Sequence, residues 1–335
     1  MALLRATDLN VTYRPSRGVD IWAVRDVSLS LEEGEFVGLV GESGCGKSTL
    51  GYALTRMLQP PAHLDSGEIE FDGTDISNLS GEDLRHQRRN GFALVLQSGM
   101  NALNPVRTIG HHFLDIQRAH AADGERPTAS SAAGHSAELL AKVQLEPGVL
   151  SRFPHELSGG MRQRVSIALA LSLEPRLIVF DEPTTALDVI VQHAVMQTIK
   201  DLQRESGFTA ILISHDLGLV IEATDRVMVM YAGKIVEDQP SARLLNGPHH
   251  PYTEALLSCY ADPRADVIEL GDIPGSPPDL SLATSGCLFA PRCALAEPVC
   301  TAEEPKLTPL DAGTAACHVR ARESTTGSKV AAHAR

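Results

Sequence analysis

The stretch Gly41-Glu42-Ser43-Gly44-Cys45-Gly46-Lys47-Ser48-Thr49 decides the fold, because it fits the pattern G-x-x-x-x-G-K-[ST] without a mismatch. Residues 36–40 before it are short and apolar, which predicts a buried strand, and residues 48–57 after it predict a helix. A strand, a loop and a helix in this order are the context that the motif needs. A glycine-rich turn that fits the pattern by chance is the alternative interpretation, and the flanking elements disfavour it.

The stretch of residues 41–49, called the phosphate loop below, has the chemistry of a nucleotide site. Its glycines let the backbone N–H groups and the helix N-terminus approach negative charge closely. Lys47 is expected to reach the β and γ phosphates, and Ser48 to ligate Mg²⁺. The expected nucleotide contacts in the loop are Gly41, Ser43, Gly44, Cys45, Gly46, Lys47, Ser48 and Thr49. The loop alone does not distinguish a kinase, a GTPase, a transport ATPase and a DNA-repair ATPase.

Length and composition set the class of protein. The 335 residues suffice for one large α/β domain and a smaller piece, and 43% hydrophobic with 21% charged residues is ordinary for a globular protein. The formal charge of −13 disfavours a broad electrostatic grip on nucleic acid. No apolar run approaches the roughly 18–20 residues that cross a bilayer, and the first residues lack a signal-peptide layout. We therefore expect a cytosolic chain whose membrane part is supplied by other subunits.

Two alternating segments predict an antiparallel β layer beside the strand at residues 36–40. They cover residues 6–13 and residues 23–31. Tyr13 and Trp22 lie in or beside them, and either aromatic face is a candidate to stack on a nucleotide base. For each residue taken alone, simple strand packing is an equally good interpretation.

Two more predicted strands end at polar residues. Residues 92–96 form a short apolar run that ends at Gln97, and residues 210–214 form another that ends at His215. Ligands bind outside the carboxyl ends of strands in α/β sheets. Gln97 is thus placed to contact Mg²⁺ or the attacking water, and His215 to bond the γ-phosphate. The alternatives are a solvated loop glutamine and a structural histidine.

A third apolar strand carries two acids at its end. Residues 177–180 are fully apolar, and Asp181 and Glu182 follow them. Asp181 suits the Mg²⁺ shell, and Glu182 suits a general base that activates water. Paired acids at such a position are often only capping or turn residues, but the sequence Pro-Thr-Thr-Ala-Leu-Asp over residues 183–188 makes that alternative less favourable.

A second anion site is expected at the start of a long alanine- and leucine-rich helix that runs to about residue 173. Ser158 is a good helix N-cap, and Gly159 and Gly160 leave backbone N–H groups accessible to an anion. This would be a phosphate site without a lysine. Upstream, the small and polar residues 121–131 predict a flexible loop between helices.

The order of these motifs resembles that of the nucleotide-binding subunit of an ABC transporter, over residues from about 3 to 240. The six motifs, in the expected order, are Walker A (41–48), the Q-loop (Gln97), the signature (157–163), Walker B (179–182), the D-loop (186–188, ending at Asp188) and the H-loop (His215). The resemblance also places an adenine-stacking aromatic after the first strand, which favours Tyr13 over Trp22.

The resemblance implies a shared ATP site. In such proteins two nucleotide-binding domains face head to tail, and each ATP lies between the Walker A motif of one and the signature of the other. Lys47 and Ser48 would hold ATP from one side, and the partner's copy of the segment Ser158-Gly159-Gly160 would cap the γ-phosphate. The implied roles are base for Glu182, γ-phosphate contact for His215, Mg²⁺ ligand for Asp181, link to the helical subdomain for Gln97, and ATP-site residue for Asp188.

A second resemblance covers residues from about 248 to 320. The segments His-Pro-Tyr-Thr at 250–253, Ile-Pro-Gly-Ser-Pro-Pro at 273–278 and Gly-Cys-x-Phe-x-Pro-Arg-Cys at 286–293 look like the C-terminal extension of oligopeptide and dipeptide importer ATPases. It implies an ATPase that energises peptide uptake. Branch members also serve nickel and some oligosaccharides, and a soluble ABC-type ATPase acting on DNA or the ribosome is a further alternative. A small-molecule kinase or GTPase would leave the signature unexplained.

Four of the six cysteines gather near the end of the chain. Cys287, Cys293, Cys300 and Cys317 have the spacing C-x5-C-x6-C-x16-C, which is not a standard zinc-finger spacing. Four thiolates can bind a [4Fe–4S] cluster or Zn²⁺, and a set of free thiols is the third alternative. Similar extensions in the peptide-importer branch carry an iron–sulfur cluster, so the resemblance favours it. Neither Cys45 nor Cys259 resembles a ligand.

The predicted fold is α/β: a P-loop NTPase of the ABC ATPase type with an antiparallel β layer, a helical subdomain and a small cysteine-rich C-terminal extension. The nucleotide-binding domain is expected at residues 1–245, with the helical subdomain at about 98–165, the extension at 246–322 and a disordered tail at 323–335. The implied partners are a second ABC ATPase subunit, identical or homologous, two transmembrane permeases and an extracytoplasmic substrate-binding protein, but no nucleic acid. The expected location is the cytoplasmic face of the cell membrane, with the chain bound to the permeases.

Overall fold

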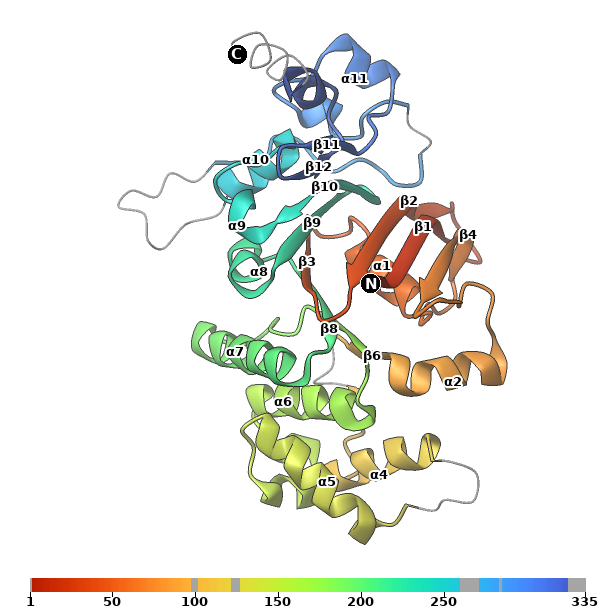
Figure 1. Ribbon diagram of the computed structural model, residues 1–335, viewed down its shortest axis with the longest axis vertical. Coiled ribbons are helices and arrows are strands. Elements are labelled where there is room, and N and C mark those ends of the chain that lie inside the picture. The colour runs from red at the N-terminus through yellow and green to blue at the C-terminus, as the bar shows by residue number, and fades with distance from the viewer. Residues whose placement is uncertain (1, 98–101, 122–126, 260–270, 283–284, 325–335) are drawn as a thin grey trace. The chain divides into compact units, whose positions relative to one another are not determined.

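The computed structural model describes residues 2–97, 102–121, 127–259, 271–282 and 285–324 (Figure 1). The chain divides into two compact units. The first unit comprises residues 1–3, 32–35 and 78–211, and the second comprises residues 4–31, 36–77 and 212–335. The phosphate loop and the C-terminal extension both belong to the second unit.

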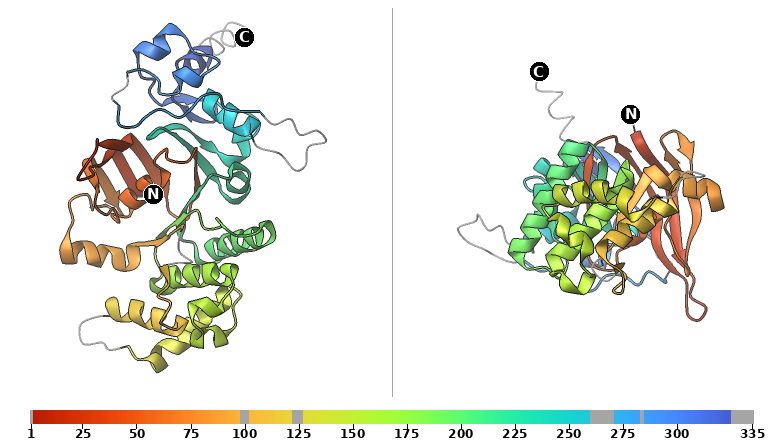
Figure 2. Two further views of the ribbon diagram at one scale, coloured as in Figure 1. Left: turned by 180° about the vertical axis from the view of Figure 1, so that it is seen from behind. Right: turned by 90° about the horizontal axis from the view of Figure 1, so that it is seen from below.

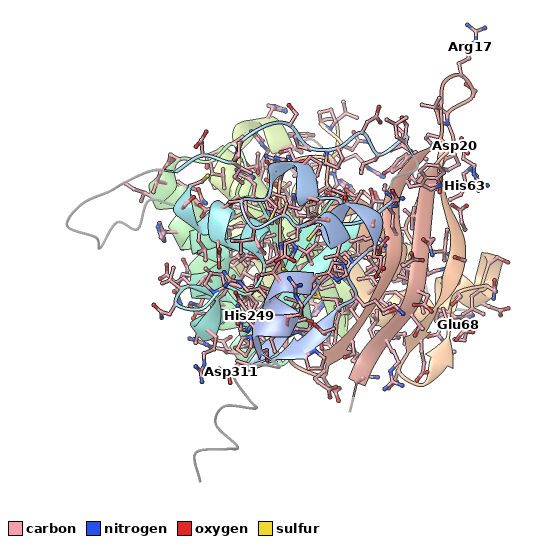
Figure 3. All side chains as sticks on the ribbon, turned by 90° about the horizontal axis from the view of Figure 1, so that it is seen from above. Arg17, Asp20, His63, Glu68, His249 and Asp311 are labelled. Atoms are coloured by element: carbon pink, nitrogen blue, oxygen red, sulfur yellow. The ribbon has the colours of Figure 1, made fainter. Side chains whose placement is uncertain are left out.

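The second unit contains the predicted antiparallel β layer. Its strands are β1 (Ala2–Tyr13), β2 (Ile21–Glu32), β4 (Ala62–Phe71) and β5 (Thr74–Asp75), in the order β2-β1-β4-β5. Strand β1 pairs with β4 in antiparallel register, from Leu4 opposite Phe71 to Tyr13 opposite Ala62. In Figure 3 Arg17 stands at the tip of the loop that joins β1 and β2, and Glu68 lies on β4. The antiparallel layer is therefore confirmed, with longer strands than predicted.

The phosphate-loop strand β3 (Phe36–Val40) runs parallel to β9 (Arg226–Tyr231), with Val40 opposite Val229. Strand β9 turns through Ala232 and Gly233, both with positive φ, into β10 (Lys234–Pro240), and the two strands pair as an antiparallel hairpin. The C-terminal extension adds two further strands: β12 (Gly313–Ala315) pairs with β10, and β11 (Thr308–Leu310) pairs with β12.

The helices of the second unit follow its strands, and several of them lie in the extension. They are α1 (Lys47–Leu54), α8 (Leu217–Ala223), α9 (Ser241–Leu244), α10 (Pro251–Ser258), the short 3₁₀ helix η4 (Ala290–Arg292) and α11 (Pro298–Ala302). Residues 318–324 are also helical. The rest of the predicted tail, residues 325–335, lies outside the described residues.

The first unit combines a parallel strand pair with helices. Strands β6 (Phe92–Val95) and β7 (Leu177–Asp181) pair in parallel, and the chain passes to the second unit within β8 (Thr209–Ser214). Its α-helices are α2 (Gly81–Gly91), α4 (Ile109–Ala119), α5 (Ala129–Lys142), α6 (Gly159–Ala170) and α7 (Val189–Ser206). Its 3₁₀ turns are η1 (Pro147–Ser151), η2 (Pro154–Glu156) and η3 (Leu171–Leu173). Helices α4, α5 and α6, yellow to light green in Figure 2, pack against one another.

One predicted loop is partly helical. Residues 129–131 belong to the first turn of α5, because Thr128 and Ser131 form a capping box in which each side-chain oxygen accepts the other's backbone N–H, at 3.2 and 3.0 Å. The small polar residues therefore start a helix there, while residues 122–126 lie outside the described part. Within the described ranges, no helix is long and apolar enough to cross a membrane.

Candidate nucleotide-binding site

The phosphate loop packs tightly where β3 ends, and two of its glycines are required for this. Gly41 has φ +152°, and a Cβ there would lie 2.1 Å from the carbonyl oxygen of Met230. Gly46 has φ +107°, and its Cβ would lie 2.1 Å from the carbonyl oxygen of Ala23. Any side chain would thus push the loop away from neighbouring backbone. The loop residues between them include the exposed Ser43 and Gly44, so the tip is open to a ligand.

The loop lysine is already directed into the loop. Nζ of Lys47 donates hydrogen bonds to the carbonyl oxygens of Gly41 at 2.8 Å and Glu42 at 3.0 Å, and the residue is 6% exposed. Sγ of Cys45 lies 3.8 Å from the same ammonium group, and burial raises the pKa of that thiol. A buried cation surrounded by backbone dipoles is the arrangement that a phosphate site requires.

The two candidate aromatics have different surroundings. The Tyr13 hydroxyl lies 3.1 Å from Oγ1 of Thr49, the last residue of the phosphate loop. Trp22 donates its backbone N–H to the carbonyl of Leu280 at 3.1 Å, and the guanidinium of Arg25 lies 5.8 Å from its ring centroid. Tyr13 is therefore the aromatic that contacts the phosphate loop, while the ring of Trp22 is partly covered by an arginine.

In the first unit, the parallel pairing of β6 and β7 brings two predicted site residues, Gln97 and Asp181, to one edge. Val95 lies opposite Phe180, so Gln97, two residues beyond β6, lies at the edge where β7 ends at Asp181. Gln97 is exposed, whereas Asp181 is 1% exposed. The polar residues that follow these two strands therefore lie at the same edge of the strand pair.

Glu182 follows β7 in an uncommon backbone conformation. Its φ is +50°, which a residue with a side chain adopts at a cost in energy. Its carboxylate accepts a hydrogen bond of 2.6 Å from Oγ1 of Thr185. Strained residues persist where the surrounding structure over-determines them, and they concentrate at functional sites.

The predicted N-cap at Ser158 is confirmed, since its Oγ accepts the backbone N–H of Met161 at 3.3 Å. Gly160 has a packing reason as well as a chemical one: a Cβ there would lie 2.6 Å from Cγ1 of Val191 on α7. Asp188 caps α7 by accepting the N–H of Val191 at 3.0 Å. The signature helix α6 and the helix that follows Asp188 therefore pack closely.

His215 lies in the second unit, exposed, one residue beyond β8. The next residue, Asp216, caps α8 by accepting the N–H of Leu219 at 3.0 Å. The predicted residues thus divide between the units. The phosphate loop, Tyr13 and His215 belong to the second unit, and Gln97, Ser158, Gly159, Gly160, Asp181, Glu182 and Asp188 to the first.

Sequence reasoning missed two residues that contact the phosphate loop from the extension. The guanidinium of Arg292 donates to both carboxylate oxygens of Glu42, at 2.7 and 3.0 Å, and these bonds raise the pKa of Arg292 further above its usual value. The Tyr252 hydroxyl accepts the backbone N–H of Glu42 at 2.8 Å. Both residues belong to segments quoted for the second resemblance, and no local signal in the sequence indicates their partner.

A buried acid holds the start of α10, which carries Tyr252. Glu237 is fully buried, and its carboxylate accepts the backbone N–H groups of His249 and His250 at 2.7 and 2.8 Å. Nδ1 of His250 in turn accepts the N–H of Tyr252 at 3.0 Å and caps the helix. Burial lowers the pKa of His250 to about 4 and raises that of Glu237.

The four clustered cysteines border one small cavity of about 10 Å³. The N–H of Cys287 donates to the carbonyl of Cys300 at 2.7 Å, and Sγ of Cys293 accepts the N–H of Leu295 at 3.3 Å. Burial raises the pKa of Cys287 to about 11 and also raises that of Cys293, which favours the thiol over the thiolate. Among the described residues, no group of three or more His, Cys, Asp or Glu is arranged to hold a metal ion.

Two families match the chain. The family described as ABC transporter matches residues 24–185, and the family described as Oligopeptide/dipeptide transporter, C-terminal region matches residues 236–300. The first match includes the phosphate loop, Gln97, Ser158 and Glu182, and the second includes Tyr252 and Arg292.

Individual proteins match over most of their length. A putative peptide import ATP-binding protein of Brucella abortus is 42% identical over 305 residues, which are 90% of this chain and 90% of that protein. The dipeptide transport ATP-binding protein DppD of Escherichia coli is 38% identical over 326 residues, 95% of this chain and 97% of that protein. A dimeric ATP-binding cassette in a post-hydrolysis state with ADP and phosphate has a TM-score of 0.63 at 28% identity, covering 71% of this chain and 98% of that chain.

Proposed function

The chain belongs to the ATP-binding subunits of ABC transporters, in the oligopeptide and dipeptide branch, and on that premise we propose that it hydrolyses ATP to drive peptide uptake through membrane permeases. The observation that carries this proposal is an intact phosphate loop, with Lys47 buried against its own loop carbonyls, in a chain that also matches the oligopeptide/dipeptide transporter C-terminal region. Similarity to peptide import proteins over 90% or more of the chain supports the same function.

We assign the binding of ATP and Mg²⁺ as follows. The phosphate loop binds the phosphates through its N–H groups and Lys47, and Tyr13 covers the adenine, which its contact with Thr49 supports. Ser48, Gln97 and Asp181 ligate Mg²⁺. From the partner subunit, the copies of Ser158, Gly159, Gly160 and Asp188 close the site, as the capped N-terminus of α6 favours an anion.

For catalysis, Glu182 is the base that activates water, with His215 and Gln97 orienting the γ-phosphate and the water. The test is Glu182→Gln, for which we expect a loss of turnover of about 10²-fold or more while ATP affinity stays within about threefold. Glu205→Gln, at an exposed position near the end of α7, is the matched control and should hydrolyse ATP at the wild-type rate. Wild-type turnover in Glu182→Gln would overturn the assignment of the base.

The second ATP-binding subunit, a copy of this chain or a homologous one, pairs through the surface beside Asp188. Val189 and Ile190, the first residues of α7, are 69% and 82% exposed, and an apolar partner surface would cover them. Size-exclusion chromatography of Glu182→Gln with ATP should show a dimer, alone or with the homologous subunit. Replacing both apolar residues by Ser should abolish it.

The two permeases bind the first unit near Gln97. A cavity of about 430 Å³ there is bordered by residues of β6, α4 and α6 and by Leu96, the neighbour of Gln97. We assign it to a cytoplasmic segment of a permease, which would link the permease to the ATP site through Gln97. A cysteine at the 79% exposed Val106 should cross-link to the permease, and one at the exposed Lys142 should not.

The location and cargo follow from these partners. The chain is bound at the cytoplasmic face of the membrane, and an extracytoplasmic binding protein delivers the peptide. Uptake of a labelled dipeptide in a deletion strain should require this chain, whereas uptake of nickel or an oligosaccharide in its place would identify the alternative cargo. Co-purification with nucleic acid and without permeases would instead support a soluble ATPase of DNA or the ribosome.

For the extension, we propose a [4Fe–4S] cluster held by Cys287, Cys293, Cys300 and Cys317, with Zn²⁺ as the alternative. Four thiols that border one cavity are the donor set of such a cluster, although their side chains would have to deprotonate and draw together around it. Anaerobic purification with iron, sulfide and zinc assays tests this. Cys300→Ser should lose the metal, and Cys259→Ser, outside the group, should keep it; a colourless protein without iron would refute the cluster.

A further inference from the structure

The C-terminal extension reaches the phosphate loop at one residue, Glu42, through two separate contacts. Arg292 binds both oxygens of its carboxylate, and Tyr252 binds its backbone N–H. The Arg292 side chain is 5% exposed and that of Glu42 24% exposed. A two-bond, charge-assisted contact in such a buried position constrains geometry far more than an exposed ion pair does.

The remaining polar group of Glu42 holds the catalytically expected lysine. Its carbonyl oxygen accepts a hydrogen bond from Nζ of Lys47, beside the carbonyl of Gly41. The carboxylate, the N–H and the carbonyl of this residue are therefore all bonded, two of them to the extension. The contacts of Glu42 with Arg292 and Tyr252 do not involve Lys47, so they hold Glu42 independently of the lysine.

Arg292 and Tyr252 are themselves held in a compact aromatic group. The Tyr231 ring, at the end of β9, lies 4.6 Å from the Tyr252 ring and 5.3 Å from the Phe289 ring. The guanidinium of Arg292 lies 5.8 Å from the Tyr231 ring centroid and donates to the carbonyl of Pro274 at 2.8 Å. The two residues are thus rigid supports for the loop rather than surface side chains.

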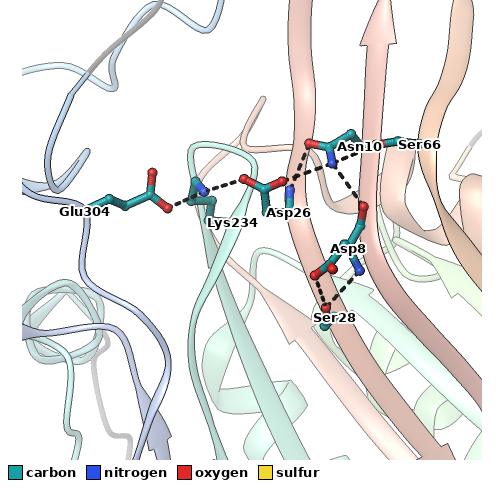
Figure 4. Close-up of polar contacts among 7 residues, drawn as sticks. All are labelled: Asp8, Asn10, Asp26, Ser28, Ser66, Lys234 and Glu304. Carbon is teal, nitrogen blue, oxygen red and sulfur yellow. Dashed lines mark hydrogen bonds and ion pairs between the residues drawn. The ribbon is translucent and has the colours of Figure 1, made fainter.

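A second contact between the extension and the rest of the unit does not reach the loop. Lys234 of β10 pairs with Glu304 of the extension and, at 3.4 Å, with Asp26 of β2, from which bonds continue to Asn10 (Figure 4). Glu304 and Asp26 are 48% and 67% exposed. A variant in this network can serve as a control, because the network also binds the extension to the rest of the unit but makes no contact with Glu42.

We propose that Arg292 and Tyr252 are positioning residues of the ATP site, which fix the phosphate loop at Glu42 and neutralise its carboxylate before ATP binds. This rests on the proposed function, since it assigns a role in ATP binding. Without Arg292 the phosphate loop loses the contact that fixes its position at Glu42. The negative charge of the Glu42 carboxylate then remains uncompensated beside the phosphate site, where it would repel the phosphates of ATP. The extension would then be part of the nucleotide site and not only an accessory segment.

The experiment measures the Kd of ATP for the full chain and the KM and kcat of the assembled transporter. We expect Arg292→Met to raise Kd and KM about tenfold with kcat within about twofold, because loop positioning serves the ground state and the transition state alike. Arg292→Lys, which keeps the charge but not the fork, should be intermediate. Tyr252→Phe should raise Kd about threefold, and Glu304→Gln should leave Kd and KM unchanged.

Binding stoichiometry separates positioning from misfolding. A structural defect lowers the fraction of chains that bind, whereas a displaced loop weakens binding at full stoichiometry. If Arg292→Met does not fold, Arg292→Lys and Tyr252→Phe decide. Wild-type Kd in these variants, with normal binding by the wild-type chain, would overturn the positioning role alone; a wild-type chain that does not bind ATP would overturn the proposed function as well.

Discussion

Oγ1 of Thr185 donates a hydrogen bond of 2.6 Å to Oε2 of Glu182, the proposed base, whose backbone has φ +50°. Thr185→Ala removes this hydrogen bond to the carboxylate, so we expect ATP turnover to fall about tenfold with ATP affinity unchanged. Thr185→Ser keeps the hydroxyl and should retain most of the activity. A steady-state ATPase assay makes the comparison, and equal rates for the Ala and Ser variants would exclude this orienting role.

Lys47 supplies the positive charge inside the phosphate loop. Lys47→Ala removes it together with two carbonyl contacts, so we expect the Kd of ATP to rise by about 10². Titration with a fluorescent ATP analogue measures this. Lys142→Ala removes an exposed lysine at the end of α5 and should bind the analogue like wild type.

Gly160 separates α6 from α7. In Gly160→Ala the new Cβ would lie 2.6 Å from Cγ1 of Val191, and relief of this overlap costs about 1–3 kcal/mol, more than alanine gains in helix propensity. We expect a lower free energy of unfolding in urea. Adding Val191→Ala should recover part of the loss, because it removes the clashing methyl groups. Gly134→Ala in α5, where a Cβ meets nothing within 4 Å, should stabilise the chain instead.

Buried His250 predicts a loss of stability in mild acid. Its pKa is lowered from 6.5 to about 4 in the folded chain. As the pH decreases from 6.5 to 4, the histidine therefore becomes protonated in the unfolded chain but stays neutral in the folded chain. The stability present above pH 6.5 is thus lost toward pH 4, by on the order of 3 kcal/mol.

His250→Asn keeps an N-cap acceptor for the N–H of Tyr252 and does not titrate. The difference in unfolding free energy between wild type and this variant should therefore change with pH between 7 and 4.5. Parallel pH profiles from urea unfolding would show that folding does not lower the pKa of His250.

The elements that could be predicted from sequence depend on short-range signals. The strand before Gly41, the apolar strand that ends at Asp181 and the cap at Ser158 each follow from a few neighbouring residues, and all three were found. Local patterns were therefore sufficient to predict the fold class and these elements.

Contacts between distant segments could not be predicted in this way. Arg292 and Glu42 are 250 positions apart, and nothing in either local sequence indicates the other. The same applies to Glu237 and the N–H groups of residues 249 and 250, because a buried acid reads as an ordinary strand residue. The capping box at Thr128 was missed because small polar residues serve both loops and helix starts.

Strand β12 covers the outer side of β10, with Ala315 opposite Glu237 and the N–H of Ala316 donating to the carbonyl of Val236 at 2.9 Å. A chain that ends at residue 245 would lack β12 and would leave the main-chain N–H and C=O groups on that side of β10 unpaired. Because β10 is still paired with β9 on its other side, it would be an exposed edge strand to which strands of other molecules can pair. Shortened versions of this protein should consequently aggregate during expression. Engineering it as a minimal cassette would need a substitute for β12, or charged and proline residues along β10, to keep that border closed.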